Sequence, residues 1–365
     1  MKILFIGDFS NLHATLAKEF NRRGHDVTVL SDKCGHIDSH ADIFLKRDKG
    51  FVGGLKYLYN LFNLLPTLKD YDIVQFINPN FFNLRPGKIK YFFDRIKGQN
   101  VKMYLTLAGN DYYFCKACLD AKVFRFSEFK IGTNFTEFHK SNPHRLYGWT
   151  SYANRNWNEY FYEQIDGAMA VLPEYDIVAR SLIGGKTVFT NLPIDLDILP
   201  TVNYNISDPI KIFIGIRSGM EIQKGSRKLL EVAKEIECEM PGKVEVVNVI
   251  DLPFTEFITK MNDSNIVLDQ LYAYSPATTA LLAMGLGKVV ASGGQPEYYE
   301  YIGNPNDKPI VTISPFDTDI KQRIINLIEN PKEIIKIGKQ SRALVEKHND
   351  VKIVADKFET IYMKK

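Results

Sequence analysis

Two cations, Arg217 and Lys224, make one short stretch of the sequence suitable for binding a charged ligand. The stretch follows an apolar, strand-like run and ends at Gly225, after which Ser226 opens a segment with helical periodicity. Guanidinium and ammonium groups neutralise diphosphate charge that the free N–H groups of a helix start only partly balance. The pattern predicts a diphosphate site, although a solvated surface turn would use the same residue types.

A second stretch with ligand-binding chemistry follows the strand-like run at 265–272. Ser275 and Pro276 are good residues for starting a helix, which we expect to run from about 276 to 284. Thr278 and Thr279 would then place hydroxyl groups where an anion would lie. The full set of residues expected at this ligand site is Gly215, Arg217, Lys224, Tyr274, Ser275, Thr278, Thr279 and Glu297.

Polar residues also follow two strand-like runs in the first half of the chain. Asp111 is the carboxylate of the loop after the run at 101–109, and it either accepts or orients a hydroxyl proton or caps the next helix. Asp8 and Ser10 follow the first run and either cap a helix or face a ligand. We expect Asp8, Ser10, Asn110 and Asp111 to bind a second, hydroxyl-bearing substrate, called the acceptor below, with Asp111, Arg217 and Lys224 as catalytic residues.

Strand-like runs alternate with helical segments along the chain, which predicts α/β architecture with parallel sheets covered by helices. The expected strands are 2–8, 25–31, 72–78, 101–109 and 167–173, then 210–216, 244–250, 265–272, 288–293 and 309–314. The proline-containing stretch at 192–209 reads as a linker. We therefore expect two Rossmann-like doubly wound domains facing a cleft, at 1–192 and 193–349.

Composition excludes several classes of protein. The 365 residues carry a net charge of +3, which is too balanced for a nucleic-acid binder. The first residues lack the features of a signal peptide, and no apolar run is long enough to span a bilayer, so a cytoplasmic location is expected. We expect no metal or other cofactor. The cysteines, including the C-x-x-C pair Cys115 and Cys118, are expected to be reduced thiols, not zinc ligands.

The order of these motifs resembles the large retaining family of GT-B nucleotide-sugar glycosyltransferases, which includes glycogen and sucrose synthases and bacterial polysaccharide-assembly enzymes. The resemblance rests on MKILFIGDFS, GAMAVLPEY, NLPIDLDIL, GIRSGMEIQKG, LLAMGLGKVVASGGQPE and ENPKEIIKIGKQSRALVEKHND. It implies an acceptor-binding first domain, a donor-binding second domain and a final helix, 350–365, that packs back on the first. It also implies that Arg217 and Lys224 hold the diphosphate of the donor.

Some family features are missing from this sequence. The family has two glutamates eight positions apart, one touching the sugar and one the ribose, and their places hold Tyr274 and Leu282 here. Asp269, Glu297 and the backbone are the alternative acceptors for sugar hydroxyls. Many members also have a histidine after the strand that 101–109 matches, where this chain has Ala108 to Asp111.

The function expected from this resemblance is metal-independent transfer, with retention, of a sugar from a nucleotide diphosphate sugar to a saccharide or lipid-linked acceptor in bacterial surface polysaccharide or glycoconjugate assembly. The alternatives are a non-catalytic nucleotide-sugar binding module and a nucleotide-sugar epimerase. Residues 85–102 carry six basic residues with interspersed aromatic residues. They either contact an anionic membrane at its inner face or form an ordinary helix with aromatic residues turned inward.

Overall fold

The computed structural model describes residues 1–32, 41–206 and 208–364, and these divide into two compact units. The first unit comprises 1–117, 144–193 and 351–365, and the second comprises 118–143 and 194–350. Cys34 lies outside the described residues. Residues 118–143 group with the second unit, a departure from the continuous first domain expected at 1–192.

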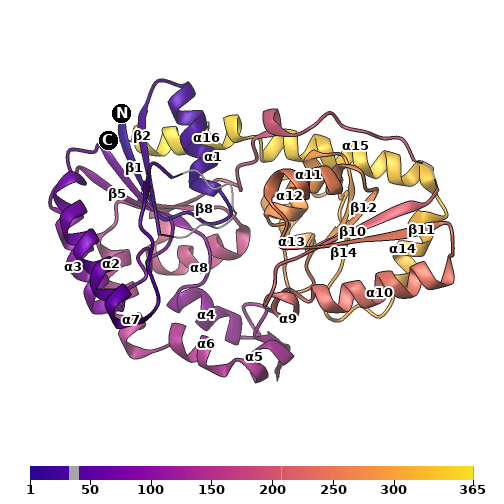
Figure 1. The fold of residues 1–365 in the computed structure, drawn as a ribbon, viewed down its shortest axis with the longest axis horizontal. Coiled ribbons are helices and arrows are strands. Elements are labelled where there is room, and N and C mark those ends of the chain that lie inside the picture. Colours follow the sequence, from indigo (N-terminus) through magenta and orange to yellow (C-terminus); the bar gives the residue numbers. More distant parts are fainter. Residues whose placement is uncertain (33–40, 207, 365) are drawn as a thin grey trace. The chain divides into compact units, whose positions relative to one another are not determined.

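The first unit is built on a parallel sheet (Figure 1). Its described strands have the order β3-β2-β1-β4-β5-β8-β9. The strands are β1 (Lys2–Ile6), β2 (Asp26–Ser31), β3 (Ile43–Phe44), β4 (Ile73–Phe76), β5 (Lys102–Leu107), β8 (Gly167–Ala170) and β9 (Thr187–Phe189). The helices are α1 (Leu12–Arg22), α2 (Gly50–Leu64), α3 (Pro86–Lys97), α4 (Tyr112–Leu119), α6 (Pro143–Trp149), α7 (Tyr152–Gln164), α8 (Pro173–Ile183) and α16 (Val351–Tyr362).

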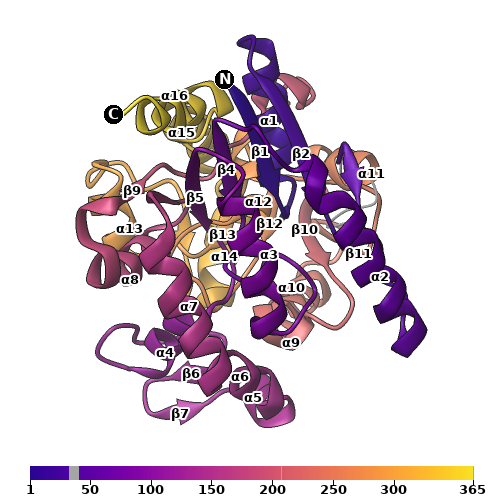
Figure 2. The ribbon, with the colours of Figure 1, turned by 90° about the vertical axis from the view of Figure 1, so that its left-hand side faces the viewer.

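Helices cover both faces of this sheet because alternate side chains of each strand point to opposite faces. Phe76 on β4 contacts Phe93 of α3 and Phe161 of α7 on one face. Phe5 on β1 packs near Phe20 of α1 on the other face. Figures 1 and 2 show these two helical layers around the strands. The sequence prediction of a doubly wound sheet is confirmed for this unit.

The second unit has a parallel sheet of described strands in the order β11-β10-β12-β13-β14. Its strands are β10 (Ile210–Ile216), β11 (Val244–Ile250), β12 (Ile266–Leu268), β13 (Val289–Ser292) and β14 (Val311–Thr312). Its helices are α9 (Glu221–Lys224), α10 (Ser226–Glu239), α11 (Phe254–Asn262), α12 (Thr278–Gly285), α13 (Pro296–Tyr301), α14 (Ile320–Ile328) and α15 (Pro331–His348). Segment 118–143 adds the antiparallel pair β6 (Lys130–Ile131) and β7 (Asn134–Phe135), and α5 (Glu137–Ser141).

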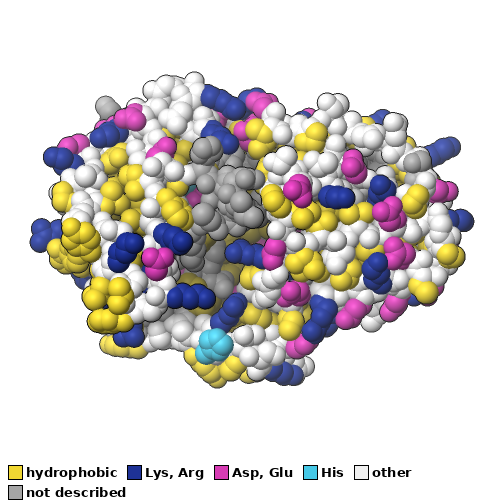
Figure 3. Space-filling model, viewed as in Figure 1, with side chains coloured by type: hydrophobic (Ala, Val, Ile, Leu, Met, Phe, Trp, Pro, Cys, Tyr) yellow, Lys and Arg dark blue, Asp and Glu magenta, His cyan; other side chains and the backbone are white. Residues whose placement is uncertain are grey.

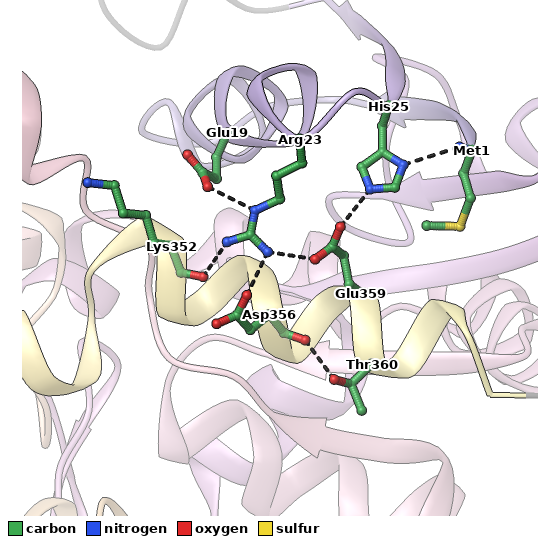
Figure 4. Close-up of polar contacts among 8 residues, drawn as sticks. All are labelled: Met1, Glu19, Arg23, His25, Lys352, Asp356, Glu359 and Thr360. Carbon is green, nitrogen blue, oxygen red and sulfur yellow. Dashed lines mark hydrogen bonds and ion pairs between the residues drawn. The ribbon is translucent and has the colours of Figure 1, made fainter.

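The carboxyl-terminal helix α16 packs on the first unit, as expected. Figure 4 shows Arg23, the residue that follows α1, bonded to Asp356 and Glu359 of α16, and Glu359 bonded to His25. Each of these three bonds is 2.6 Å long. On its buried side, the Tyr362 hydroxyl donates to the Gln75 side chain on β4 at 3.0 Å. Apolar contacts and ion pairs together therefore fix this last helix to the first sheet.

Candidate functional site

The predicted donor-site residues of the second unit occupy loops at the carboxyl ends of β10, β12 and β13. Because these strands are parallel neighbours, their carboxyl ends lie at one edge of the sheet. Arg217 is the first residue after β10, and Lys224 is the last residue of α9. Within the described part of the chain, neither cation forms a side-chain hydrogen bond or an ion pair within 4.0 Å, so both charges are available to a ligand.

Glycine 225 brings the Lys224 loop against the end of β12. Its φ is +75°, and a Cβ there would come within 2.7 Å of Leu271 Cβ, so the position favours glycine. The Leu271 amide donates to the Lys224 carbonyl at 2.9 Å. Gly215 has a different reason for being small, because a Cβ would meet the Phe257 ring of α11 at 2.5 Å. Its predicted donor contact remains a prediction.

Helix α12 begins at Thr278, two residues later than the expected start at Pro276, with Ala277 as its cap. Among the described residues, the amides and hydroxyls of Thr278 and Thr279 have no hydrogen-bond partner. The first amides of a helix have no partner inside the helix and carry partial positive charge. This helix start therefore suits an anion, and the two threonine hydroxyls lie beside it as predicted donor-binding groups.

Asp269, named as a substitute acceptor for sugar hydroxyls, is buried at the carboxyl end of β12. Burial raises the pKa of its carboxyl group, while the Lys224 charge and hydrogen bonds from Ser292 and the Ala280 amide oppose the rise. Its contact with the Ala280 amide engages one amide of the α12 start. Asp269 therefore supports the helix and places its carboxyl group near Lys224.

The loop after β12 is tied closely to the loop after β13. A Cβ on Gly293 would come within 2.5 Å of the Ala273 carbonyl oxygen, which explains a glycine there. The Gln295 amide donates to the Tyr274 carbonyl at 2.9 Å. Ser275 is fully buried. Glu297, in the first turn of α13, forms an ion pair with Arg125 at 2.7 Å, so its carboxylate already has a cationic partner.

In the first unit, Asp8 accepts hydrogen bonds from the backbone amides of His13 at 3.0 Å and Ala14 at 3.3 Å, so it caps α1. Burial raises the pKa of Asp8 to about 6, against the lowering effect of these amides. Ser10 is exposed and has φ of +54°, a left-handed conformation that is uncommon without glycine. The capping alternative is thus observed for Asp8, and the acceptor-binding role of both residues remains a prediction.

Asp111 also has a structural contact of its own. Its carboxylate accepts from the Phe114 amide at 2.7 Å, at the start of α4, and from the Tyr162 hydroxyl at 2.6 Å. Burial raises the pKa of Asp111, and the Tyr162 and Phe114 bonds partly oppose the rise. Asn110 contributes its carbonyl to the Asn78 side chain at 3.2 Å. Asp111 therefore caps a helix and carries a pKa shifted toward that of a proton acceptor.

A small pocket lies at the carboxyl edge of the first sheet and has room for about one water molecule. Asp111, Gly109 and Asn78 are among its lining residues, with Tyr162 and Tyr175. Gly109 has φ of +73°, and its amide donates to the Tyr175 hydroxyl at 3.0 Å. Neither tyrosine could be assigned to this pocket from the sequence, because both come from helices more than 40 residues further along the chain.

The buried His13 is a structural residue. Its ring nitrogens lie 2.7 Å from the Gly7 carbonyl and 2.8 Å from the Thr106 hydroxyl, and burial lowers its pKa to about 3. The described residues contain no group of three or more His, Cys, Asp or Glu side chains placed to hold a metal ion. Asp195 and Asp197 have D-x-D spacing, but the Asp195 carboxylate accepts from the Asp197 amide at 3.2 Å. Cys115 and Cys118 are buried and unbridged.

Comparison with known proteins identifies solved structures of the same fold. No protein-family model and no curated protein matches the sequence. Sucrose-phosphate synthase from Thermosynechococcus elongatus superposes with a TM-score of 0.64 at 13% identity, covering 99% of this chain and 98% of that one. Anabaena HepE in complex with UDP-glucose gives a TM-score of 0.62 at 13% identity, covering 99% and 98%.

A third similar structure is the lipopolysaccharide outer core galactosyltransferase WaaB, with a TM-score of 0.54 at 13% identity, covering 99% of both chains. At such identities the comparison establishes architecture alone. The chain, with a parallel α/β sheet in each of its two units, thus has the GT-B fold of the family that its sequence resembles.

Proposed function

We propose that this protein transfers a glycosyl group from a nucleotide diphosphate sugar to a hydroxyl acceptor. The observation that carries the proposal is the edge of the second sheet, where two unpaired cations and the open start of α12 follow neighbouring parallel strands. The names of three similar structures point the same way. One is a sucrose-phosphate synthase, HepE is in complex with UDP-glucose, and WaaB is a galactosyltransferase. Their fold supports the proposal without fixing the base or the sugar.

The second unit would supply electrostatic catalysis. When the glycosidic bond to the diphosphate breaks, negative charge grows on the β-phosphate. Arg217, Lys224 and the amides of Thr278 and Thr279 would stabilise that charge and so lower the barrier to departure of the nucleoside diphosphate. Gly215, Tyr274, Ser275 and Glu297 complete the proposed donor site. No metal is required by this scheme, because the side chains themselves neutralise the leaving group.

The first unit would bind the acceptor, with Asp8, Ser10, Asn110 and Asp111 near it. We propose Asp111 as the residue that orients or deprotonates the attacking hydroxyl, since its carboxylate is buried and its pKa is raised. Retention of the anomeric configuration follows from the family resemblance. The acceptor is a saccharide or lipid-linked saccharide of bacterial surface polysaccharide or glycoconjugate assembly.

We further propose that the protein works at the inner face of an anionic membrane, through an exposed surface of the first unit. In residues 85–102, Ile89, Phe92, Phe93 and Ile96 of α3 are buried and Tyr91 alone among its large apolar side chains is exposed, so this stretch mostly matches the ordinary-helix alternative. The neighbouring α2 instead exposes a row of large apolar side chains, Phe51, Val52, Leu55, Tyr59 and Phe62. Exposed cations lie beside it, at Lys46, Lys49 and Lys56.

Figure 3 shows hydrophobic and basic side chains together over this part of the first unit. Rings and cations in this combination suit a bilayer interface with anionic lipids. None of the described helices has the length and apolarity needed to cross a bilayer. Sedimentation with phosphatidylglycerol vesicles should fall sharply in the double variant Phe51→Ser, Tyr59→Ser, and unchanged sedimentation would contradict the membrane proposal.

The experiment for the main proposal is a transfer assay with a panel of nucleotide sugars and saccharide acceptors. Arg217→Ala and Lys224→Ala should each lower kcat/KM for the donor about 100-fold, the scale seen when one charge-stabilising group is removed. Lys228→Ala, an exposed lysine on α10 with no partner among the described residues, is the matched control and should leave transfer unchanged. Normal transfer by both variants would show that Arg217 and Lys224 are not part of the donor site.

The same assay separates the alternatives that the missing glutamates suggest. Binding of a nucleotide sugar without transfer or hydrolysis for any acceptor would favour a binding module. Interconversion of free nucleotide sugars without an acceptor would favour an epimerase. Sugar transfer with release of the nucleoside diphosphate supports the proposed transferase.

A further inference from the structure

Segment 118–143 is inserted into the first half of the chain but belongs to the second unit. The chain enters it near the end of α4 and leaves it at the start of α6. Between these helices it forms the β6–β7 pair and α5. It contacts the three loops that carry the proposed donor-binding residues, with at least one contact to each loop.

The contact with the loop after β12 is an aromatic stack. Phe126 and Tyr274 have ring centroids 4.4 Å apart and ring planes 10° apart, and the Phe126 amide donates to the Tyr274 hydroxyl at 3.2 Å. Phe126 is 2% exposed. The stack and the hydrogen bond hold Tyr274, which precedes Ser275 and the start of α12. The orientation of this turn therefore depends on Phe126.

The contacts with the other two loops are polar. Glu128 accepts a hydrogen bond from the side chain of Gln223, the residue before Lys224. Arg125 pairs with Glu297 in the loop and first turn after β13 at 2.7 Å, and its guanidinium also lies 5.5 Å from the centre of the Tyr274 ring. One short stretch of four residues, 125–128, thus links the loops after β10, β12 and β13.

We propose that segment 118–143 supports the donor site from one side. Within the segment, Phe126 and Glu128 are positioning residues for the diphosphate-binding loops. This inference rests on the proposed function. Tyr274 stands where the resembling family has a sugar-contacting glutamate, and here its ring is committed to Phe126. The turn at 274–279 is thus held for the donor by this packing and by the hydrogen bond from the Phe126 amide.

The test compares donor affinity with folding stability in matched variants. Calorimetry with UDP, ADP, GDP and TDP measures Kd, and thermal unfolding without ligand measures stability. Phe126→Ala should raise Kd for the diphosphate that binds wild type about tenfold, because it removes an aromatic stack that orders the turn. Phe135→Ala is the control, since Phe135 is 45% exposed and packs on His139 and Lys130 within the segment; it should leave Kd unchanged.

Glu128→Gln is the milder variant if Phe126→Ala does not fold. It keeps the side chain and removes the charge that faces Gln223, so a smaller rise in Kd is expected at unchanged thermal stability. A change in stability with an unchanged Kd in both variants would show a merely structural role and overturn the inference.

Hydrogen exchange of the unliganded proteins separates this inference from the proposed function. Amides at 272–279 should exchange faster in Phe126→Ala than in wild type and Phe135→Ala, whatever ligand the site takes. Unchanged exchange at 272–279 overturns the inference even if diphosphate binds. Failure of wild type to bind any diphosphate, with faster exchange in Phe126→Ala, would overturn the proposed function and the donor role, and leave only the positioning of the loop supported.

Discussion

Replacing Asp8 by asparagine should change how the stability of the first unit depends on pH. Burial raises the pKa of this carboxyl from 3.8 to about 6 in the folded protein. Stabilisation from the protonated carboxyl is therefore complete below pH 3.8 and is lost as pH rises through about 6. At 1.36 kcal/mol per pKa unit the whole effect is about 3 kcal/mol, of which about 2 kcal/mol falls between pH 4.5 and 7.

The assay is urea unfolding of Asp8→Asn and wild type at several pH values, followed by tryptophan fluorescence. Both tryptophans, Trp149 and Trp157, lie in the first unit with Asp8, so their signal reports the relevant transition. The variant should gain about 2 kcal/mol relative to wild type between pH 4.5 and 7. The asparagine side chain itself changes the free energy of unfolding by the same amount at every pH, so it does not affect this pH-dependent difference. The titration of His13 contributes equally to both proteins.

A difference between the two proteins that does not change with pH would refute the raised pKa. Transfer activity of Asp8→Asn then distinguishes the two roles of Asp8. Because asparagine also caps helices well, activity close to wild type indicates that Asp8 acts as the cap of α1 alone. A loss of activity without a loss of fluorescence amplitude supports its proposed contact with the acceptor.

Three further outcomes follow from the same contacts. Tyr162→Phe removes a hydrogen bond that lowers the pKa of Asp111, so the acidic limb of the pH–rate profile should move to higher pH. If the limb does not move, Asp111 is not the group that accepts the proton in the reaction. Arg23→Ala should destabilise the docking of α16 by about 2 kcal/mol, seen as faster hydrogen exchange at 351–364, whereas Arg22→Ala, whose ion pair joins it to Glu19 of its own helix, should not. Prolonged EDTA treatment should leave transfer activity unchanged, and a loss restored by a divalent cation would contradict the metal-independent scheme.

The sheet strands were predictable because each apolar run had the length and flanking turns of a buried parallel strand. The broken helices of the tail were also predictable, since Pro331 and the polar residues around Asn349 mark the ends of α14 and α15. The two-residue β3 was missed, because a pair of apolar residues gives no measurable period. The start of α12 was placed too early because Pro276 is a good first residue, while the turn bonded to Gln295 extends through it.

The membership of segment 118–143 in the second unit could not be predicted. Its link depends on Phe126 meeting Tyr274, residues 148 positions apart, and no local pattern encodes such a contact. The same limit applies to Asp111, where sequence identified the residue and its two roles but not the Tyr162 hydroxyl beside it. In 85–102 the spacing of basic and aromatic residues fitted both alternatives, and only the burial of Phe92 and Phe93 distinguishes them.

The most direct test of the whole account is a crystal structure of the protein soaked with the nucleoside diphosphate that binds in calorimetry. The account predicts that the β-phosphate contacts the side chains of Arg217 and Lys224 and the amides of Thr278 and Thr279. A diphosphate bound away from these four residues, or no binding at millimolar concentration, would contradict it.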